Sequence, residues 1–155
     1  MKLFYSYFLF IISISITFSQ EVGNVYDLNC YKYVMINIPK YHFSKQDDKE
    51  IIRTVRNLFL NKGFKTYTND VDFSKLPAEY YNDSCIVLNC FLEYNPTIKT
   101  TDFLRITLKN CIEEIVYENT GKSIWSMGGA IDEAFEPIKN MNYEYDPNRK
   151  ITPIK

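Results

Sequence analysis

Short β-type segments flank one strongly amphipathic helix in the first half of the chain. Residues 31–38 are rich in β-branched and aromatic residues and stop at Pro39, which is typical of a strand. Apolar residues then recur at helical spacing over residues 47–62, and Gly63 follows as a stop signal. Residues 64–67 have the composition of a second, short strand. The apolar stripe of the helix is therefore expected to cover a sheet.

Period-2 alternation dominates the second half of the chain. It follows a segment, residues 68–83, that is predicted as a loop with a turn at residues 76–77. Residues 84–94 and residues 102–117 carry apolar residues at most even positions, which predicts two strands with one buried face each. The polar link over residues 95–101 predicts that these strands form an antiparallel hairpin.

The hairpin also predicts a disulfide. If it closes symmetrically about Ile98, Leu88 faces Leu108 on the buried side and Cys85 faces Cys111 on the other side. Directly opposed residues have Cβ atoms about 4.5 to 5.5 Å apart, close to disulfide reach. The alternative is that these are free thiols, because the four cysteines allow three connectivities and a register slip of about two residues would separate this pair.

A second hairpin is predicted at residues 119–121, Asn-Thr-Gly, as a type I turn followed by glycine in the left-handed region. Pairing through this turn gathers four apolar side chains on the face away from the core: Ile115, Tyr117, Trp125 and Met127. Either the carboxyl-terminal segment or the loop 68–83 covers this patch, or the patch binds a protein partner with Trp125 at its centre.

The run Gly121-Lys122-Ser123 matches only the end of a phosphate-binding loop. That loop requires a glycine where this chain has Val116, and a helix that begins at the Lys-Ser step. Because both requirements fail, no nucleotide or other cofactor is predicted. Helical spacing resumes only from Ala130, and Pro137 interrupts it.

The amino terminus has the layout of a secretory signal peptide. Lys2 precedes an apolar run that ends in small residues at Ser19, and serines break this run before it reaches the roughly 20 residues that a membrane span needs. The sequence thus predicts a signal peptide over residues 1–19, one domain over residues 20–142 and a loose tail over residues 143–155. The mature protein is expected in the periplasm or outside the cell, with no integral membrane span.

The charge balance and the residue composition argue against nucleic-acid binding and against a metal or catalytic site. The chain holds 18 Lys and Arg against 19 Asp and Glu, a net charge of −1, so it lacks the basic surface that nucleic-acid binding needs. Aromatic residues make up 16% of the chain, enough to expect some on a recognition surface. His42 is the only histidine, and the acidic residues Asp132, Glu133 and Glu136 lack calcium-loop spacing. No catalytic residue and no metal site are predicted.

The segment NTGKSIWSMGGAIDEAF, residues 119–135, gives the chain a likeness to known proteins. With the preceding strands and helix, it resembles small bacterial envelope α+β proteins, the lipopolysaccharide-assembly lipoproteins and TolB amino-terminal-like domains. The resemblance covers residues 31–142 and implies a non-enzymatic envelope protein that binds a partner, by adding to a sheet edge. The chain departs from the lipoproteins because no cysteine directly follows its amino-terminal apolar run.

These observations predict an α+β fold. We expect a two-layer sandwich in which helices cover one face of a mostly antiparallel sheet of four to five strands, in the order β-α-β-β-β-α. The expected function is that of an exported, non-enzymatic binding or envelope-assembly protein that contacts a protein partner. The alternative is a small secreted ligand carrier or hydrolase, which requires a convergent polar pocket between the helix 47–62 and the sheet.

Overall fold

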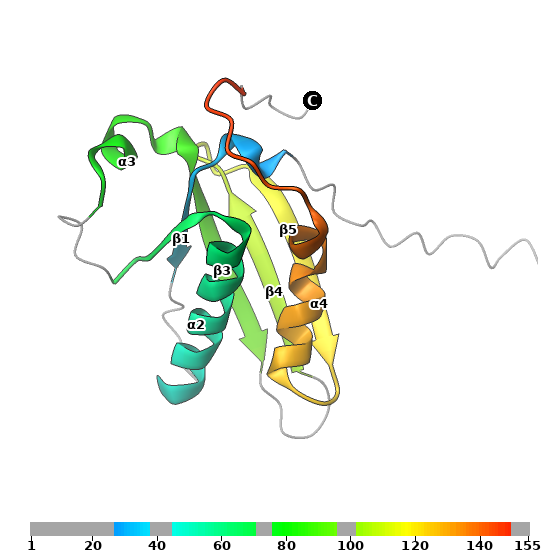
Figure 1. Cartoon of the computed structure of the whole chain (residues 1–155). Coiled ribbons are helices and arrows are strands. Elements are labelled where there is room, and N and C mark those ends of the chain that lie inside the picture. Colours follow the sequence, from blue (N-terminus) through cyan, green and yellow to red (C-terminus); the bar gives the residue numbers. More distant parts are fainter. Residues whose placement is uncertain (1–26, 38–44, 71–75, 96–101, 150–155) are drawn as a thin grey trace, which may run out of the picture.

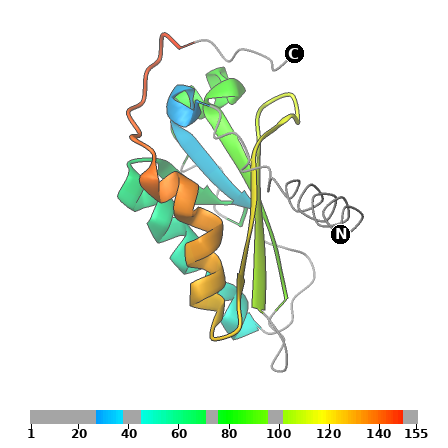
Figure 2. The ribbon, with the colours of Figure 1, turned by 90° about the vertical axis from the view of Figure 1, so that its right-hand side faces the viewer.

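The computed structural model describes residues 27–37, 45–70, 76–95 and 102–149. The predicted signal peptide, His42 and the link 96–101 lie outside these residues. Five strands form one open sheet in the order β2-β1-β3-β4-β5. The strands are β1 (Tyr33–Asn37), β2 (Lys65–Thr68), β3 (Val87–Asn95), β4 (Asp102–Lys109) and β5 (Ile115–Ser123). Helices α2 (Lys45–Lys62) and α4 (Met127–Asn140) lie side by side on one face of the sheet (Figures 1 and 2).

The predicted α+β fold class is confirmed, with a mixed sheet. Strand β1 runs parallel to both β2 and β3, whereas β4 runs antiparallel to β3 and β5. The parallel pairs arise because α2 carries the chain from the end of β1 back to the start of β2. The predicted helix and the strands on either side of it match α2, β1 and β2. Gly63 ends α2 with φ of 102°, as its position after the last helical lysine predicts.

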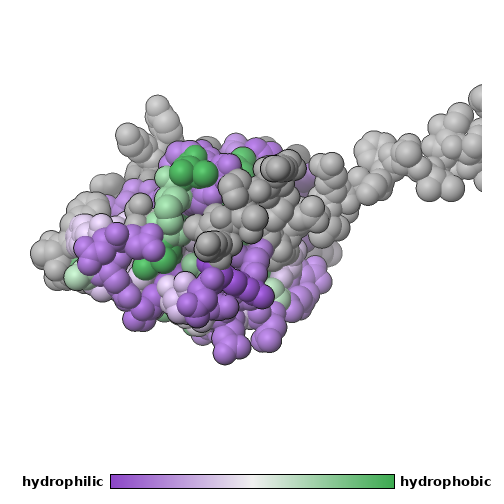
Figure 3. Space-filling view, turned by 90° about the horizontal axis from the view of Figure 1, so that it is seen from above, coloured by the Kyte–Doolittle hydropathy of each residue, from purple (hydrophilic) through white to green (hydrophobic). Residues whose placement is uncertain are grey.

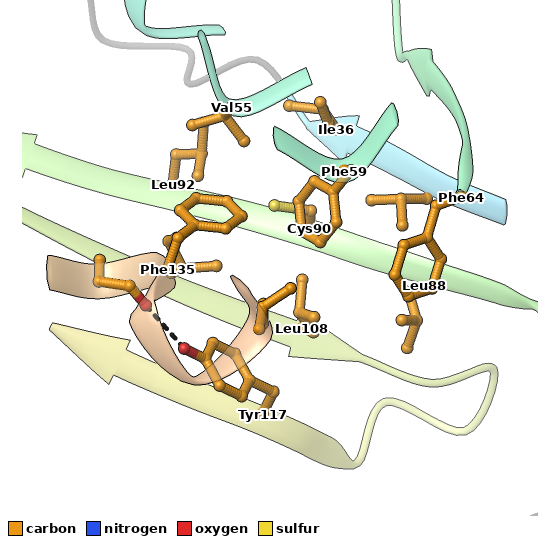
Figure 4. Close-up of a cluster of buried hydrophobic side chains, with 14 of the residues drawn as sticks. Ile36, Val55, Phe59, Phe64, Leu88, Cys90, Leu92, Leu108, Tyr117 and Phe135 are labelled. Atoms are coloured by element: carbon orange, nitrogen blue, oxygen red, sulfur yellow. Dashed lines mark hydrogen bonds between the residues drawn. The ribbon is translucent and has the colours of Figure 1, made fainter. Parts of the chain in front are cut away.

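The main core fills the space between the two helices and the sheet. Phe59 of α2 packs edge to face against Phe64, with centroids 5.7 Å apart, and against Phe135 of α4, with centroids 5.1 Å apart. Figure 4 shows these rings meeting the side chains that point up from the strands. The buried members of this layer include Val34, Ile36, Ile51, Val55, Leu88, Cys90, Leu92, Leu104, Ile106 and Leu108.

A smaller core covers the other face of β1. Tyr33, Met35, Leu76 and Val87 form this second cluster beside the short helix α3 (Ala78–Asn82). The cluster corrects the prediction of a plain loop over residues 68–83. Glu79 of α3 accepts hydrogen bonds from Lys32 and from the buried Tyr33 hydroxyl, and these bonds lower the pKa of its carboxyl.

The prediction of one strand over residues 102–117 is wrong. Strand β4 ends at Lys109, and the chain turns over residues 110–114 before β5 begins. The Asn110 side chain builds this turn, because its Oδ1 accepts from the backbone N–H groups of Ile112 at 3.1 Å and Glu114 at 3.0 Å. Glu113 adopts φ of 62° there.

The predicted register of the first hairpin is also displaced. The structure pairs Cys90 with Leu108 and Leu92 with Ile106, whereas the symmetric closure places Leu88 opposite Leu108. The shift is two residues along the strand. Because side chains alternate with period 2, a shift of two keeps every residue on its predicted face.

The second predicted hairpin does not exist, because residues 119–121 lie inside β5. Gly121 is buried against α4, and a Cβ added to it would lie 1.9 Å from the carbonyl oxygen of Ala130 and 2.4 Å from the backbone nitrogen of Ala134. Its φ is not in the left-handed region. This glycine therefore permits close approach of a helix to a strand.

The carboxyl-terminal segment is attached rather than loose over residues 143–149. Tyr143 stacks on Phe64 with ring centroids 3.8 Å apart, and its hydroxyl donates to the Tyr31 carbonyl at 2.7 Å. The backbone N–H of Asp146 donates to the Asn29 carbonyl at 2.9 Å. Residues 150–155 lie outside the described residues. The segment after α4 therefore closes the end of the core, against residues that come just before β1.

Candidate functional site

The connection between β5 and α4 holds the most exposed apolar side chains of the described residues. Trp125 is 88% exposed and Ile124 is 70% exposed. They follow Ser123, the last residue of β5, and precede Ser126, the N-cap of α4. An exposed tryptophan beside an exposed isoleucine is unusual on a surface that contacts only water. We call Ile124 and Trp125 the tip of β5.

Two serines hold the backbone of the tip of β5. The Ser123 Oγ accepts from the N–H groups of Trp125 at 3.2 Å and Ser126 at 3.3 Å. The Ser126 Oγ in turn accepts from the Gly129 N–H at 3.2 Å, which caps α4. A Cβ added to Gly129 would lie 2.6 Å from the Ser123 Oγ, so a glycine lets the helix start this close to the strand end. The Trp125 side chain thus projects from a well-fixed backbone.

The predicted four-residue patch does not assemble. Tyr117 is buried under α4, where its hydroxyl donates to the Ala134 carbonyl at 2.6 Å (Figure 4), and Met127 packs partly buried against the main core. Ile115 is 48% exposed, but it begins β5 while Trp125 lies beyond its other end. Of the predicted patch, only Trp125 therefore belongs to the tip of β5, and its exposed neighbour is Ile124.

The predicted patch is wrong in part because, from Tyr117 to Gly121, the residues of β5 that face the core are odd-numbered, whereas even-numbered residues are expected there. Ladder partners change register between Leu108 and Lys109, because Tyr117 pairs with Leu108 whereas Ile115 pairs with Lys109. Two residues of β5 thus face one residue of β4, which is a bulge. Together with the turn over residues 110–114, the bulge places the odd-numbered residues of β5 from Tyr117 to Gly121 on the core face, where even-numbered residues are expected.

The free edge of β5 is partly occupied by a side chain of α4. The backbone N–H of Lys122 donates to Glu133 Oε2 at 2.6 Å, so this N–H points away from β4. No strand among the described residues pairs with that edge. A carboxylate that takes an edge N–H is one way to limit unwanted strand pairing.

Cys85 and Cys111, the predicted candidate pair, form a disulfide with Cα atoms 4.8 Å apart. The two cysteines are not opposed residues of neighbouring strands, as the predicted hairpin places them. Cys85 lies in the 3₁₀ turn η3 (Ser84–Ile86) before β3, and Cys111 lies in the turn after β4. With a sequence separation of 26 between the cysteines, the bond stabilises the fold by about 3.5 kcal/mol in the chain-entropy model. A disulfide fits a protein of an oxidising compartment outside the cytoplasm.

The two remaining cysteines are inert core residues. Cys30 and Cys90 are buried, and desolvation raises the pKa of each thiol. A thiol that stays protonated is a weak nucleophile and a weak metal ligand. Among the described residues, no three His, Cys, Asp or Glu side chains group as a metal site would require.

The space between α2, α4 and the sheet is apolar. Its lining consists of the main-core side chains shown in Figure 4. In the described part of the chain, the buried side chains that carry polar groups are Thr66, Asn110 and four tyrosines. Asn110 is engaged in its own turn, and the Tyr117 hydroxyl bonds the Ala134 carbonyl. The convergent polar cluster that a carrier or hydrolase requires is thus not found here among the described residues.

Most of the described residues visible at the end of the molecule opposite the tip of β5 are hydrophilic (Figure 3). Seen from above, hydrophobic residues there form a narrow strip and not a broad patch (Figure 3). An open polar hollow of about 480 Å³ lies at the carboxyl-terminal segment and is lined by Asn29, Asn142, Glu144, Tyr145, Asp146 and Arg149. Because acidic groups and an arginine both line it, the hollow does not favour a ligand of one charge.

No protein-family model matches this sequence, and no curated protein sequence matches it. Among solved structures, the chain is similar to the PelC dodecamer from Paraburkholderia phytofirmans, with 16% identity and a TM-score of 0.41. The likeness covers 72% of this chain and 85% of that chain. It is too distant to support a conclusion about function, and the resemblance to lipopolysaccharide-assembly and TolB-like proteins stays a prediction. No described helix combines the length and the apolar run that a membrane span requires.

Proposed function

We propose that this protein is an exported, non-enzymatic binding or assembly protein of the cell envelope that contacts a protein partner through the tip of β5. The observation that carries the proposal is the 88% exposure of Trp125 on a backbone fixed by Ser123 and Ser126. Tryptophan side chains that enter a partner's pocket supply much of the binding energy of protein interfaces. A preformed loop lowers the entropy lost on binding.

Two further observations support this function over the alternative of a carrier or hydrolase. The helix–sheet interface is filled by apolar side chains, which leaves binding to the surface. The Cys85–Cys111 disulfide suits a periplasmic or extracellular protein. The partner is expected to present an apolar pocket, because the tip of β5 offers an indole and a branched aliphatic side chain.

The test is quantitative capture of envelope proteins with tagged wild type and tagged Trp125→Ala. A residue of this kind contributes about 2 kcal/mol or more, so the variant should retain its true partner about 30-fold less. Ile112→Ala is the matched control, because Ile112 is 62% exposed but lies in the turn after β4. Equal recovery of every captured protein by the wild type and both variants would refute the proposal.

A further inference from the structure

The outer edge of β5 can accept another strand. Because the Lys122 N–H points away from β4, the alternation of an antiparallel ladder directs the N–H and C=O groups of Thr120 and Glu118 the same way. These three residues therefore present a row of donors and acceptors along the edge. The row lies within a strand of nine residues, long enough for a stable ladder.

The charges along this edge are complementary to a second copy of themselves. Glu118, Thr120 and Lys122 place their side chains on the sheet face away from α2 and α4, in the order acid, neutral, base. If a second copy of β5 pairs antiparallel about Thr120, Glu118 of each copy lies opposite Lys122 of the other. A two-fold arrangement creates this ion pair twice. The ion pairs within the described part of the chain do not include Lys122.

The same register also brings the exposed apolar residues together. Ile115 begins β5 and Trp125 follows its end, at equal distances in sequence from Thr120. In the antiparallel pair, Ile115 of one copy therefore reaches the tip of β5 of the other. A displacement of two residues in either direction would lose the Thr120 pairing and both charge pairs.

We propose that the partner bound at the tip of β5 is a second copy of this chain, and that the two β5 strands pair antiparallel about Thr120 into one continuous sheet. This inference rests on the proposed function, because it names the protein that Trp125 contacts. The interface consists of one strand pair and two apolar ends. The dimer is therefore expected to be weak, with a dissociation constant on the order of 10 µM.

Glu133 regulates this pairing. Its carboxylate holds the Lys122 N–H in the single copy, at the position that the Glu118 carbonyl of the second copy takes in the dimer. Glu133 is exposed, so its side chain can turn into water when the second strand arrives. Removing the carboxylate frees one donor of the edge and is expected to strengthen the dimer about threefold.

Sedimentation velocity from about 1 µM to about 500 µM tests the pairing, with protein produced by export so that the disulfide forms. The wild type should shift from monomer to dimer over this range. Glu118→Lys and Lys122→Glu each place like charges opposite one another twice and should weaken the dimer about tenfold. The double variant Glu118→Lys with Lys122→Glu restores both pairs and should recover wild-type association. Thermal unfolding of each variant checks that its monomer is intact.

Three outcomes would overturn the inference: a wild type that is monomeric throughout, a double variant as weak as the single ones, or a Glu133→Ala variant that dimerises less well. A monomeric wild type whose Trp125-dependent capture of an envelope protein persists would refute self-pairing and leave the proposed function standing. A charge-dependent dimer that captures nothing else through Trp125 would support the self-pairing and refute a separate envelope partner.

Discussion

The two helices that cover the sheet contact it in different ways. Helix α2 reaches the strands with large side chains, chiefly Val55 and Phe59, both fully buried. Helix α4 brings its own backbone to β5, where Ala130 and Ala134 lie against Gly121. The α2 contact depends on the volume of its side chains, whereas the α4 contact requires that Gly121 has no side chain.

This difference has a functional consequence. The position of α4 on β5 is fixed by direct backbone contact, and the Ser123 to Ser126 connection joins the two elements at their ends. The tip of β5 therefore adjoins a helix–strand contact in which backbone meets backbone. The α2 contact can adapt by repacking and lies away from the candidate site.

The largest effect is expected where α2 loses its central side chain. Phe59→Ala removes a fully buried ring that contacts both Phe64 and Phe135, and it should lower the free energy of unfolding by about 4 kcal/mol. Phe59→Leu keeps most of the volume and should cost about 1.5 kcal/mol. Urea denaturation measures both. Equal losses for the two variants would show that the α2 contact does not depend on volume.

Gly121→Ala should break the α4 contact with a single methyl group. Its Cβ would overlap the Ala130 carbonyl, so α4 must move away from β5, at a cost of about 3 kcal/mol. The shift should also change the emission of Trp125, the single tryptophan of the chain. Gly128→Ala is the control, because the nearest atom to its added Cβ lies 3.7 Å away and alanine favours the helix. A Gly121→Ala protein as stable as this control would contradict the close contact.

The α2 region could be predicted from the sequence, whereas the contact between α4 and β5 could not. The α2 region is predicted nearly to the residue, because apolar spacing and a terminal glycine are local signals. The role of Gly121 is not predicted. In a single sequence, a glycine that is needed for helix packing cannot be distinguished from a glycine that is needed for a turn. Asn110 was the missed signal, since an asparagine that bonds the N–H groups two and four residues ahead marks a turn. The apolar alternation continues across that turn and conceals it.

The candidate site is predicted in part for the same reason. Cys85 precedes β3 and Cys111 follows β4, so the two cysteines lie at the same end of this antiparallel pair, and their pairing survives a register error of two residues. The predicted patch fails instead because Trp125 and Met127 lie beyond the end of β5, and because the bulge beside Leu108 reverses the parity of the strand itself. Tyr117 therefore packs inward, and no pattern within the sequence indicates that bulge.

Tyr117 offers a smaller change at the α4 contact, and one that depends on pH. Tyr117→Phe removes the hydrogen bond to the Ala134 carbonyl and should cost about 1.5 kcal/mol at pH 7. Burial raises the pKa of Tyr117 to about 12, so between about pH 10 and pH 12 the hydroxyl ionises only in the unfolded chain. The wild type then loses stability that the phenylalanine variant keeps. Urea denaturation at pH 7 and near pH 11 should show the gap closing, and a constant gap would contradict the raised pKa.

The smallest effect is expected at the tip of β5 itself. Ser123→Ala removes the acceptor for the N–H groups of both Trp125 and Ser126, and because both groups are exposed to water the cost in stability should be about 0.5 kcal/mol. The local effect should be larger than the global one, since the backbone of Trp125 loses its fixed orientation. The fluorescence anisotropy of Trp125 should fall, while Thr54→Ala on α2 should leave it unchanged. If Ser123→Ala weakens dimerisation without loss of stability, the fixed backbone contributes to binding. An unchanged anisotropy would show that α4 alone, through its contact with Gly121, orients the tip.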